Sequence, residues 1–205
     1  MNKLQYKFSG KTTTYYLDAD FSYLGKLVEQ DHTVLITDEH LFSKHQKRFG
    51  GWNTIVINAG EQFKVQETVD SIIAQLIELG ADRKTTLVGI GGGVVTDITG
   101  YVAAIYMRGL PVGYVPTSIL AMVDASIGGK NGIDVGVYKN MVGTIRQPQF
   151  LLYIPQELQC ASSSLDQGWV LARYQQEVEE EEEEDSLAVW TCFYLEEKTL
   201  CFCFS

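Results

Sequence analysis

The sequence predicts an α/β protein built on a doubly wound, mostly parallel sheet with helices on both faces. Three compact apolar runs, at 33–37, 54–58 and 85–90, are typical of strands that are buried on both sides. Segments of helical spacing separate them, and this alternation of strand and helix favours a parallel sheet. The third run leads directly into three glycines at 91–93. Because such sheets bind ligands at the carboxyl ends of their strands, we expect the functional site there.

The expected elements follow from alternation, apolar runs and helical spacing. In chain order they are strands at 4–8 and 13–17, a helix near 21–30, a strand at 33–37, a helix at 39–49, a strand at 54–58, a helix at 66–79, a strand at 85–90, a helix at 94–107 and a strand at 112–116. Alternation predicts the first two strands, and uninterrupted apolar runs predict the later ones. Val69, Ile72 and Leu76 give the third helix an apolar face, and Gly80 is expected to end it.

Composition and charge exclude several classes of protein. Of the 205 residues, 45% are hydrophobic, which excludes a fully disordered chain. No apolar run reaches the roughly 18 residues that a transmembrane helix needs, and the N-terminus lacks the pattern of a secretory signal. A cytoplasmic protein with no membrane partner is therefore expected. The formal net charge of −10 argues against a nucleic-acid partner.

The excess negative charge is confined to the residues beyond Pro155. Residues 156–205 hold twelve acidic and two basic side chains, whereas residues 1–155 carry fourteen of each. All four cysteines also lie in this tail, and the spacing of Cys201 and Cys203 does not fit a zinc knuckle. We therefore expect two parts, an α/β domain at 1–155 and an acidic, cysteine-containing tail at 156–205.

The junction between the third buried run and the three glycines is the strongest local signal. Glycines let the backbone approach a phosphate, and the start of the following helix presents free N–H groups. The strict dinucleotide fingerprint fails at Val94, and a tight turn without a ligand is the structural alternative. Asp97, one turn further on, is either a first-turn acid favoured by the helix dipole or an acceptor for a ligand.

A polar, glycine-rich segment at 123–140 allows two interpretations. Its Asn-Gly and Gly-Gly pairs are typical of a surface β-hairpin. Arg108, Lys130 and Lys139, however, lie in a stretch with few acids, and such cations suit a substrate with several negative charges. The residues by themselves leave both interpretations open.

Together these segments resemble the 3-dehydroquinate synthases of the sugar-phosphate cyclase superfamily. The resemblance is carried by GGGVVTDITGYVAAIYMRG at 91–109, PTSILAMVDASIGGKNGID at 116–134 and YKNMVGTIRQP at 138–148, with GEQFK at 60–64 on the adenosine side. It covers about residues 30–154. So many motifs in the same order are more specific than a lone glycine fingerprint.

The resemblance implies a Rossmann-like, NAD-binding domain of a carbon–oxygen lyase in aromatic amino-acid biosynthesis, the shikimate pathway. The expected substrate is 3-deoxy-D-arabino-heptulosonate 7-phosphate, and the product is 3-dehydroquinate. In this family NAD transiently oxidises a ring hydroxyl, which acidifies the neighbouring C–H and lets phosphate leave. The ketone is then reduced again, and the ring opens and recloses by an aldol step. The resemblance also implies a divalent zinc or cobalt ion and a homodimer.

The resemblance further implies roles for individual residues. Those expected to contact NAD are Asp38, Glu61, Lys64, Gly92, Gly93, Asp97, Thr117, Ser118 and Lys139. The expected catalytic residues are Asp124, where cofactor and substrate meet, and three that would hold the anionic and hydroxyl groups of the substrate, Arg108, Lys130 and Asn140.

The tail departs from the family pattern. The family continues into a helical domain whose Glu and two His side chains bind the metal, but residues 156–205 contain no histidine. That domain is therefore expected to be missing or replaced, and no metal ligand is assigned, since a catalytic zinc usually has three protein ligands. The histidines that lie elsewhere are expected at the surface: His32, His40 and His45. A frameshift or a truncation would explain the change in composition.

Three functions are consistent with these motifs. The first is 3-dehydroquinate synthase activity, which we expect to be lost in this chain without the metal-binding domain. The second is an iron- or zinc-dependent alcohol dehydrogenase, a class that shares the GGG-x-x-x-D junction. The third is a non-catalytic NAD-binding fragment. The segments at 100–101, 108–109 and 124–132 favour the cyclase over the dehydrogenase.

Overall fold

The chain folds into two compact units, Met1–Ser164 and Leu165–Ser205. The computed structural model describes residues 2–8, 11–118, 120–122, 128–154, 191–195 and 198–202. In the second unit, β10 (Thr191–Leu195) and β11 (Lys198–Phe202) pair as antiparallel strands. The predicted boundary and the acidic run of the tail lie outside the described residues, so the division into two functional parts stays a prediction.

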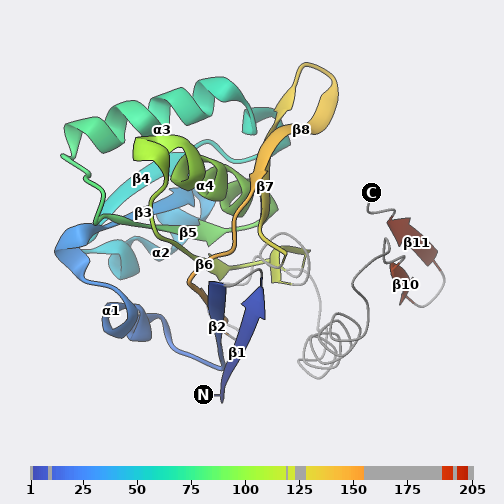
Figure 1. Ribbon diagram of the computed structural model, residues 1–205, viewed down its shortest axis with the longest axis horizontal. Helices are drawn as coiled ribbons and strands as arrows, with labels where there is room; N and C mark the ends of the chain where they lie inside the picture. Colours follow the sequence, from blue (N-terminus) through green and yellow to red (C-terminus); the bar gives the residue numbers. More distant parts are fainter. Residues whose placement is uncertain are drawn as a thin grey trace. The chain divides into compact units, whose positions relative to one another are not determined.

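A seven-stranded, mostly parallel sheet forms the centre of the first unit (Figure 1). Its strands lie in the order β1-β2-β9-β6-β5-β3-β4. Their bounds are β1 Asn2–Phe8, β2 Lys11–Leu17, β3 Thr33–Asp38, β4 Asn53–Ile57, β5 Thr86–Gly91, β6 Val112–Pro116 and β9 Phe150–Leu152. Strands β1 and β2 are antiparallel, and each other neighbouring pair in this sheet is parallel.

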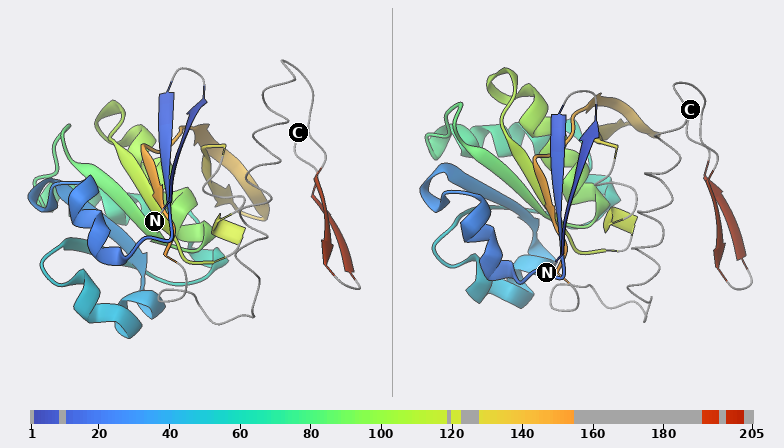
Figure 2. Two further views of the ribbon diagram at one scale, coloured as in Figure 1. Left: turned by 90° about the horizontal axis from the view of Figure 1, so that it is seen from below. Right: turned by 60° about the horizontal axis from the view of Figure 1, so that its bottom comes forward.

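Helices cover both faces of the sheet, α3 and α4 on one and α1 and α2 on the other (Figures 1 and 2). Their bounds are α1 Leu24–Leu27, α2 Glu39–Phe49, α3 Gln66–Glu78 and α4 Gly93–Ile105, with 3₁₀ turns η1 at Phe21–Tyr23, η2 at Gln30–His32, η3 at Glu61–Phe63 and η4 at Tyr106–Arg108. The predicted doubly wound α/β fold is thereby confirmed. No helix among the described residues is long and apolar enough to cross a membrane.

Strand β3 shows why the buried strands consist mostly of apolar residues. Its side chains alternate between the two faces, so that Val34 and Ile36 pack in the core beneath α3 and α4. Leu35 points the other way and packs in the core beneath α1 and α2. All three are almost fully buried, as are Thr33 and Thr37, so a strand covered on both faces consists of apolar and small β-branched side chains.

Two elements differ from the sequence-based expectation. The helix expected near 21–30 is reduced to the single turn α1, because Val28 at its end is already extended (φ −138°, ψ 149°). Strand β9 is missing from the expected elements. Its three residues are buried between β2 and β6, and they begin an apolar run at 150–154 that is as long as the run at 33–37.

A separate hairpin, formed by β7 (Lys130–Val135) and β8 (Tyr138–Ile145), packs against α4 (Figure 1). Its turn begins at Gly136, whose φ of 61° favours glycine. The hairpin interpretation of this segment is therefore confirmed, but the turn is not where the Asn-Gly pair predicts it. Asn131 and Gly132 lie inside β7.

Candidate cofactor-binding site

Four neighbouring parallel strands, β4, β3, β5 and β6, end at one edge of the sheet. The chain passes from β3 outward to β4 on one side and from β5 outward to β6 on the other, so the direction of winding reverses between β3 and β5. A crevice opens at such a reversal because the connecting segments diverge there. This protein has a cavity of about 290 Å³ at that position.

The cavity is lined by the loops that follow these strands. Asp38 at the end of β3, Gly92 and Gly93 after β5, and Thr117 and Ser118 after β6 all border it. These are five of the nine residues expected to contact NAD. Because they come from three strands that are separate in the sequence, the sheet order alone brings them together.

The glycines at 91–93 have two distinct roles. A Cβ atom on Gly91 would lie 2.6 Å from Cγ2 of Val95, so this glycine is needed for α4 to pack closely on β5. Gly92 precedes α4 as its N-cap, and a Cβ atom there would meet nothing nearer than Oγ of Ser118, at 3.5 Å. The N–H groups of the first turn of α4 have no partners within the helix, and the residues that carry them, 93–95, line the cavity. Such an arrangement suits a phosphate group.

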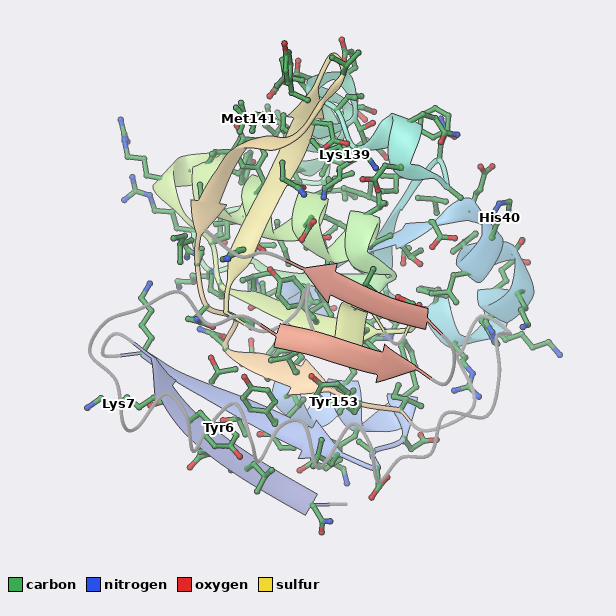
Figure 3. All side chains as sticks on the ribbon, turned by 90° about the vertical axis from the view of Figure 1, so that its right-hand side faces the viewer. Tyr6, Lys7, His40, Lys139, Met141 and Tyr153 are labelled. Carbon is green, nitrogen blue, oxygen red and sulfur yellow. The ribbon has the colours of Figure 1, made fainter. Side chains whose placement is uncertain are left out.

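Helix α2 contributes two residues, His40 and Lys44, that are not among those the sequence predicts for the site. The Oδ1 atom of Asp38 accepts a hydrogen bond of 2.9 Å from the Leu41 N–H, which caps α2. His40 and Lys44, one turn apart on this helix, line the cavity as well and are exposed. Figure 3 shows His40 on α2. His40 could have been predicted from its position, because it follows the end of β3 by two residues.

A second group of predicted site residues meets beside α4. The Lys64 ammonium group donates hydrogen bonds to Oδ2 of Asp97 at 2.5 Å and to Oδ1 of Asn140 at 2.6 Å. The side chain of Lys64 is only 5% exposed and that of Asp97 17%. A buried ammonium group needs such partners because its transfer out of water is costly. Asp97 therefore acts neither as a helix-dipole acid alone nor as a free acceptor, since it is the ion-pair partner of Lys64.

The remaining predicted residues lie around these two groups. Lys139 and Glu61 form an exposed ion pair at 3.4 Å, which is expected to contribute little to stability. Arg108 and Lys130 are exposed and do not border the cavity. Asp124 lies outside the described residues.

The described residues do not fit a divalent metal ion. Within the part of the chain that the structure describes, no group of three or more His, Cys, Asp and Glu side chains could hold such an ion. The residues at the cavity do fit a dinucleotide, because backbone amides for a diphosphate and a carboxylate for ribose hydroxyls border the same space.

Strand β8 bulges at Lys139 and Asn140, two of the residues that the sequence predicts for the site. Ile133 pairs with Val142 and Val135 with Tyr138, so that three residues of β8, 139–141, lie opposite Asp134 alone. Within this bulge Asn140 adopts a φ of 54°, in the left-handed region. Bulges re-aim side chains, and this one directs Asn140 toward Lys64.

A buried polar network holds the hairpin against the main sheet. The Tyr114 hydroxyl of β6 donates to Oδ1 of Asn131 at 2.7 Å, and Nδ2 of Asn131 donates to the Gly129 carbonyl at 2.6 Å. Burial raises the pKa of Tyr114, and the negative charge of Asp97 raises that pKa further. Gly100 of α4 faces this network, since a Cβ atom on it would collide with Asn131 and Tyr114. Neither Asn131 nor Gly100 is among the residues that the sequence predicts for such a role.

The sequence also matches a known family over the segment that builds these groups. The model of the family described as 3-dehydroquinate synthase, N-terminal, matches residues 54–165, which is more than half of the chain. The chain belongs to the 3-dehydroquinate synthase family. The resemblance stated from the motifs is thereby confirmed, and the matched range holds both the glycines beside the cavity and the β7–β8 hairpin.

Two synthases are among the solved structures with a similar fold. A 2-deoxy-scyllo-inosose synthase in complex with carbaglucose-6-phosphate, NAD+ and Co2+ is 24% identical, with a TM-score of 0.67 over 75% of this chain and 46% of that one. The 2-epi-5-epi-valiolone synthase from Streptomyces hygroscopicus subsp. jinggangensis 5008, with NAD+ and Zn2+ bound, is 26% identical, with a TM-score of 0.64 over 73% of this chain and 44% of that one.

The fold extends to dehydrogenases as well. A probable glycerol dehydrogenase from Sinorhizobium meliloti 1021 is 22% identical, with a TM-score of 0.52 over 68% of this chain and 38% of that one. This member of the 3-dehydroquinate synthase family thus spans less than half the length of each of these solved relatives.

Proposed function

We propose that this chain is the NAD-binding half of a 3-dehydroquinate synthase and holds NAD in the cavity where β3, β5 and β6 end. The observation that carries the proposal is the convergence of the Asp38 carboxylate, the glycines before α4 and the hydroxyl side chains of Thr117 and Ser118 on one cavity. A carboxylate at this place suits ribose hydroxyls, and helix amides suit a diphosphate. The NAD+ bound by the two synthases of similar fold supports the choice of cofactor.

Different residues of this chain would bind NAD and the sugar phosphate. When bound, NAD supplies the reversible oxidation of a substrate hydroxyl. The amides of the first turn of α4 would hold its diphosphate. Lys64, fixed by Asp97 and Asn140 beside α4, would contact NAD outside the part of the cavity that the diphosphate fills. Arg108 and Lys130 carry exposed positive charge that would attract the phosphate of 3-deoxy-D-arabino-heptulosonate 7-phosphate.

The Gly92→Ala variant is expected to weaken NAD binding without lowering stability. The added methyl group has room in the fold, because its nearest neighbour is Oγ of Ser118 at 3.5 Å, but it borders the cavity that the diphosphate would occupy. We expect the dissociation constant for NAD to rise by about tenfold. Isothermal titration calorimetry on the full chain measures this constant, and thermal unfolding checks the fold.

The matched control is Gly25→Ala. Its Cβ atom would meet nothing within 4 Å, and Gly25 does not border the cavity, so NAD affinity should match that of the wild type. If the wild-type chain does not bind NAD, or if Gly92→Ala binds it as tightly as the wild type, the cofactor assignment is wrong.

We further expect the isolated chain to bind NAD without converting the sugar phosphate. This expectation rests on residues 156–205, which contain no histidine for the metal site that the family uses. A phosphate-release assay with the heptulosonate phosphate, NAD and zinc tests it, and sustained phosphate release would contradict it. NADH formation from simple alcohols, measured in parallel, would instead favour a dehydrogenase.

A further inference from the structure

We propose that Asp134 is a positioning residue that holds the β8 bulge and thereby aims Asn140 at the Lys64 ammonium group. Asp134 itself is not expected to touch cofactor or substrate. The proposal rests on the assignment of Lys64 and Asn140 to the ligand site made above.

Three hydrogen bonds form a closed ring around this point. The Asp134 N–H donates to the Lys64 carbonyl at 2.8 Å, and Oδ1 of Asp134 accepts from the Asn140 N–H at 2.8 Å. The ring closes through the Asn140 side chain, whose Oδ1 accepts from the Lys64 ammonium group at 2.6 Å. The position of each residue in the ring is therefore determined by the other two.

The bulge explains why such a restraint is needed. Asp134 is the single residue of β7 opposite residues 139–141 of β8, so the N–H of Asn140 lacks the regular ladder partner that a paired strand would give it. The carboxylate supplies that partner by a charge-assisted hydrogen bond. It also fixes Asn140 at its positive φ, a conformation that asparagine tolerates but does not prefer.

Relaxation of the β8 bulge would affect Lys64 through its hydrogen-bond partners. Lys64 is buried, so its ammonium group depends on Asp97 and Asn140 to replace water. If the bulge relaxes, Asn140 swings away and the ammonium group loses one of its two acceptors. Lys64 would then turn toward water and leave the position from which it would contact NAD.

The test compares Asp134→Leu, which removes the acceptor, with Asp134→Asn, which keeps an oxygen at the same place. Two properties are measured on the full chain: the NAD dissociation constant and the ¹H–¹⁵N signal of the Lys64 ammonium group, assigned by its absence in a Lys64→Arg variant. A buried, hydrogen-bonded ammonium group exchanges its hydrogens slowly enough to give this signal, whereas an exposed one does not. If Asp134 contributed only to the overall stability of the fold, both folded variants would keep the ammonium signal.

We expect Asp134→Leu to lose the ammonium signal and to raise the NAD dissociation constant about tenfold. Asp134→Asn should keep the signal and bind NAD within about twofold of the wild type, because its Oδ1 still accepts from Asn140. Met141→Ala is the control within the same bulge, since the Met141 side chain is 68% exposed, and it should change neither property. Figure 3 shows Met141 and Lys139 on this hairpin.

The proposal is overturned if Asp134→Leu keeps both the signal and the affinity, or if Asp134→Asn loses as much as Asp134→Leu. Should Asp134→Leu fail to fold, Asp134→Ser replaces it, because its shorter side chain places the oxygen out of reach of Asn140. If the wild-type chain shows the ammonium signal but no NAD binding, the proposed function is wrong. The signal in the Asp134 variants then decides the positioning role by itself.

Discussion

The Asp97→Leu variant is expected to lower the free energy of unfolding by about 3–5 kcal/mol, because it leaves the buried Lys64 ammonium group without its counter-charge. The ion pair is 2.5 Å long and both side chains are largely buried, so water cannot take the place of the carboxylate without opening the fold. Among the described residues, Oδ1 of Asn140 would then be the remaining acceptor for the Lys64 ammonium group, and a neutral amide does not offset a buried positive charge. Urea-induced unfolding, followed by circular dichroism, measures the loss.

Two further variants separate the charge from the packing of this pair. Asp97→Asn keeps an acceptor oxygen and should lose less stability than Asp97→Leu. The double variant Lys64→Met with Asp97→Leu removes both charges, and most of the lost stability should return. A loss of less than about 1 kcal/mol for Asp97→Leu, the range of an exposed pair, would show that Lys64 is hydrated and that the buried-pair description is wrong.

The Gly100→Ala variant is expected to destabilise the protein by about 2–4 kcal/mol, although alanine favours a helix over glycine by about 1 kcal/mol. The new Cβ atom would collide with the Asn131 amide and the Tyr114 hydroxyl. Either α4 moves away from β7 or the buried hydrogen bond between Tyr114 and Asn131 breaks. Both outcomes cost more than the gain in helix propensity. Thermal and urea unfolding measure the net effect.

A second substitution tests whether this collision is the cause. In a Gly100→Ala, Asn131→Ala double variant the colliding amide is gone. The double variant should therefore lose less stability than the sum of the losses measured for Gly100→Ala alone and for Asn131→Ala alone. Gly25→Ala, which introduces the same methyl group in open space, should leave stability nearly unchanged. A Gly100→Ala protein as stable as the wild type would mean that α4 and the hairpin are not in close contact.

Much of the fold could be predicted from local patterns. The runs at 33–37, 54–58 and 85–90 form β3, β4 and β5 within one residue at each end, because strands inside a sheet consist mainly of apolar and β-branched residues. The expectation that the run at 54–58 is buried on both sides is wrong, since β4 is the edge strand and only Ile55 and Ile57 are buried in it. The glycines at 91–93 were likewise placed correctly between a strand and a helix. The shortness of helix α1 could not be predicted, because four residues are too few to show a helical period. Strand β9 begins an apolar run at 150–154 that carries the same signal as the other buried strands, although it is missing from the expected elements.

The sequence by itself determined the α/β architecture, the family and the place of the cavity at the strand ends, because all three depend on local patterns and on motifs in a fixed order. Only the tertiary structure decided which side chains meet. Lys64 bonds to Asp97, 33 residues away, and to Asn140, 76 residues away. No local period encodes contacts over such separations, since they depend on the packing of the hairpin on α4 and on a bulge in β8. For the same reason the partner of Asp97 and the part played by Asp134 became visible only in the folded chain.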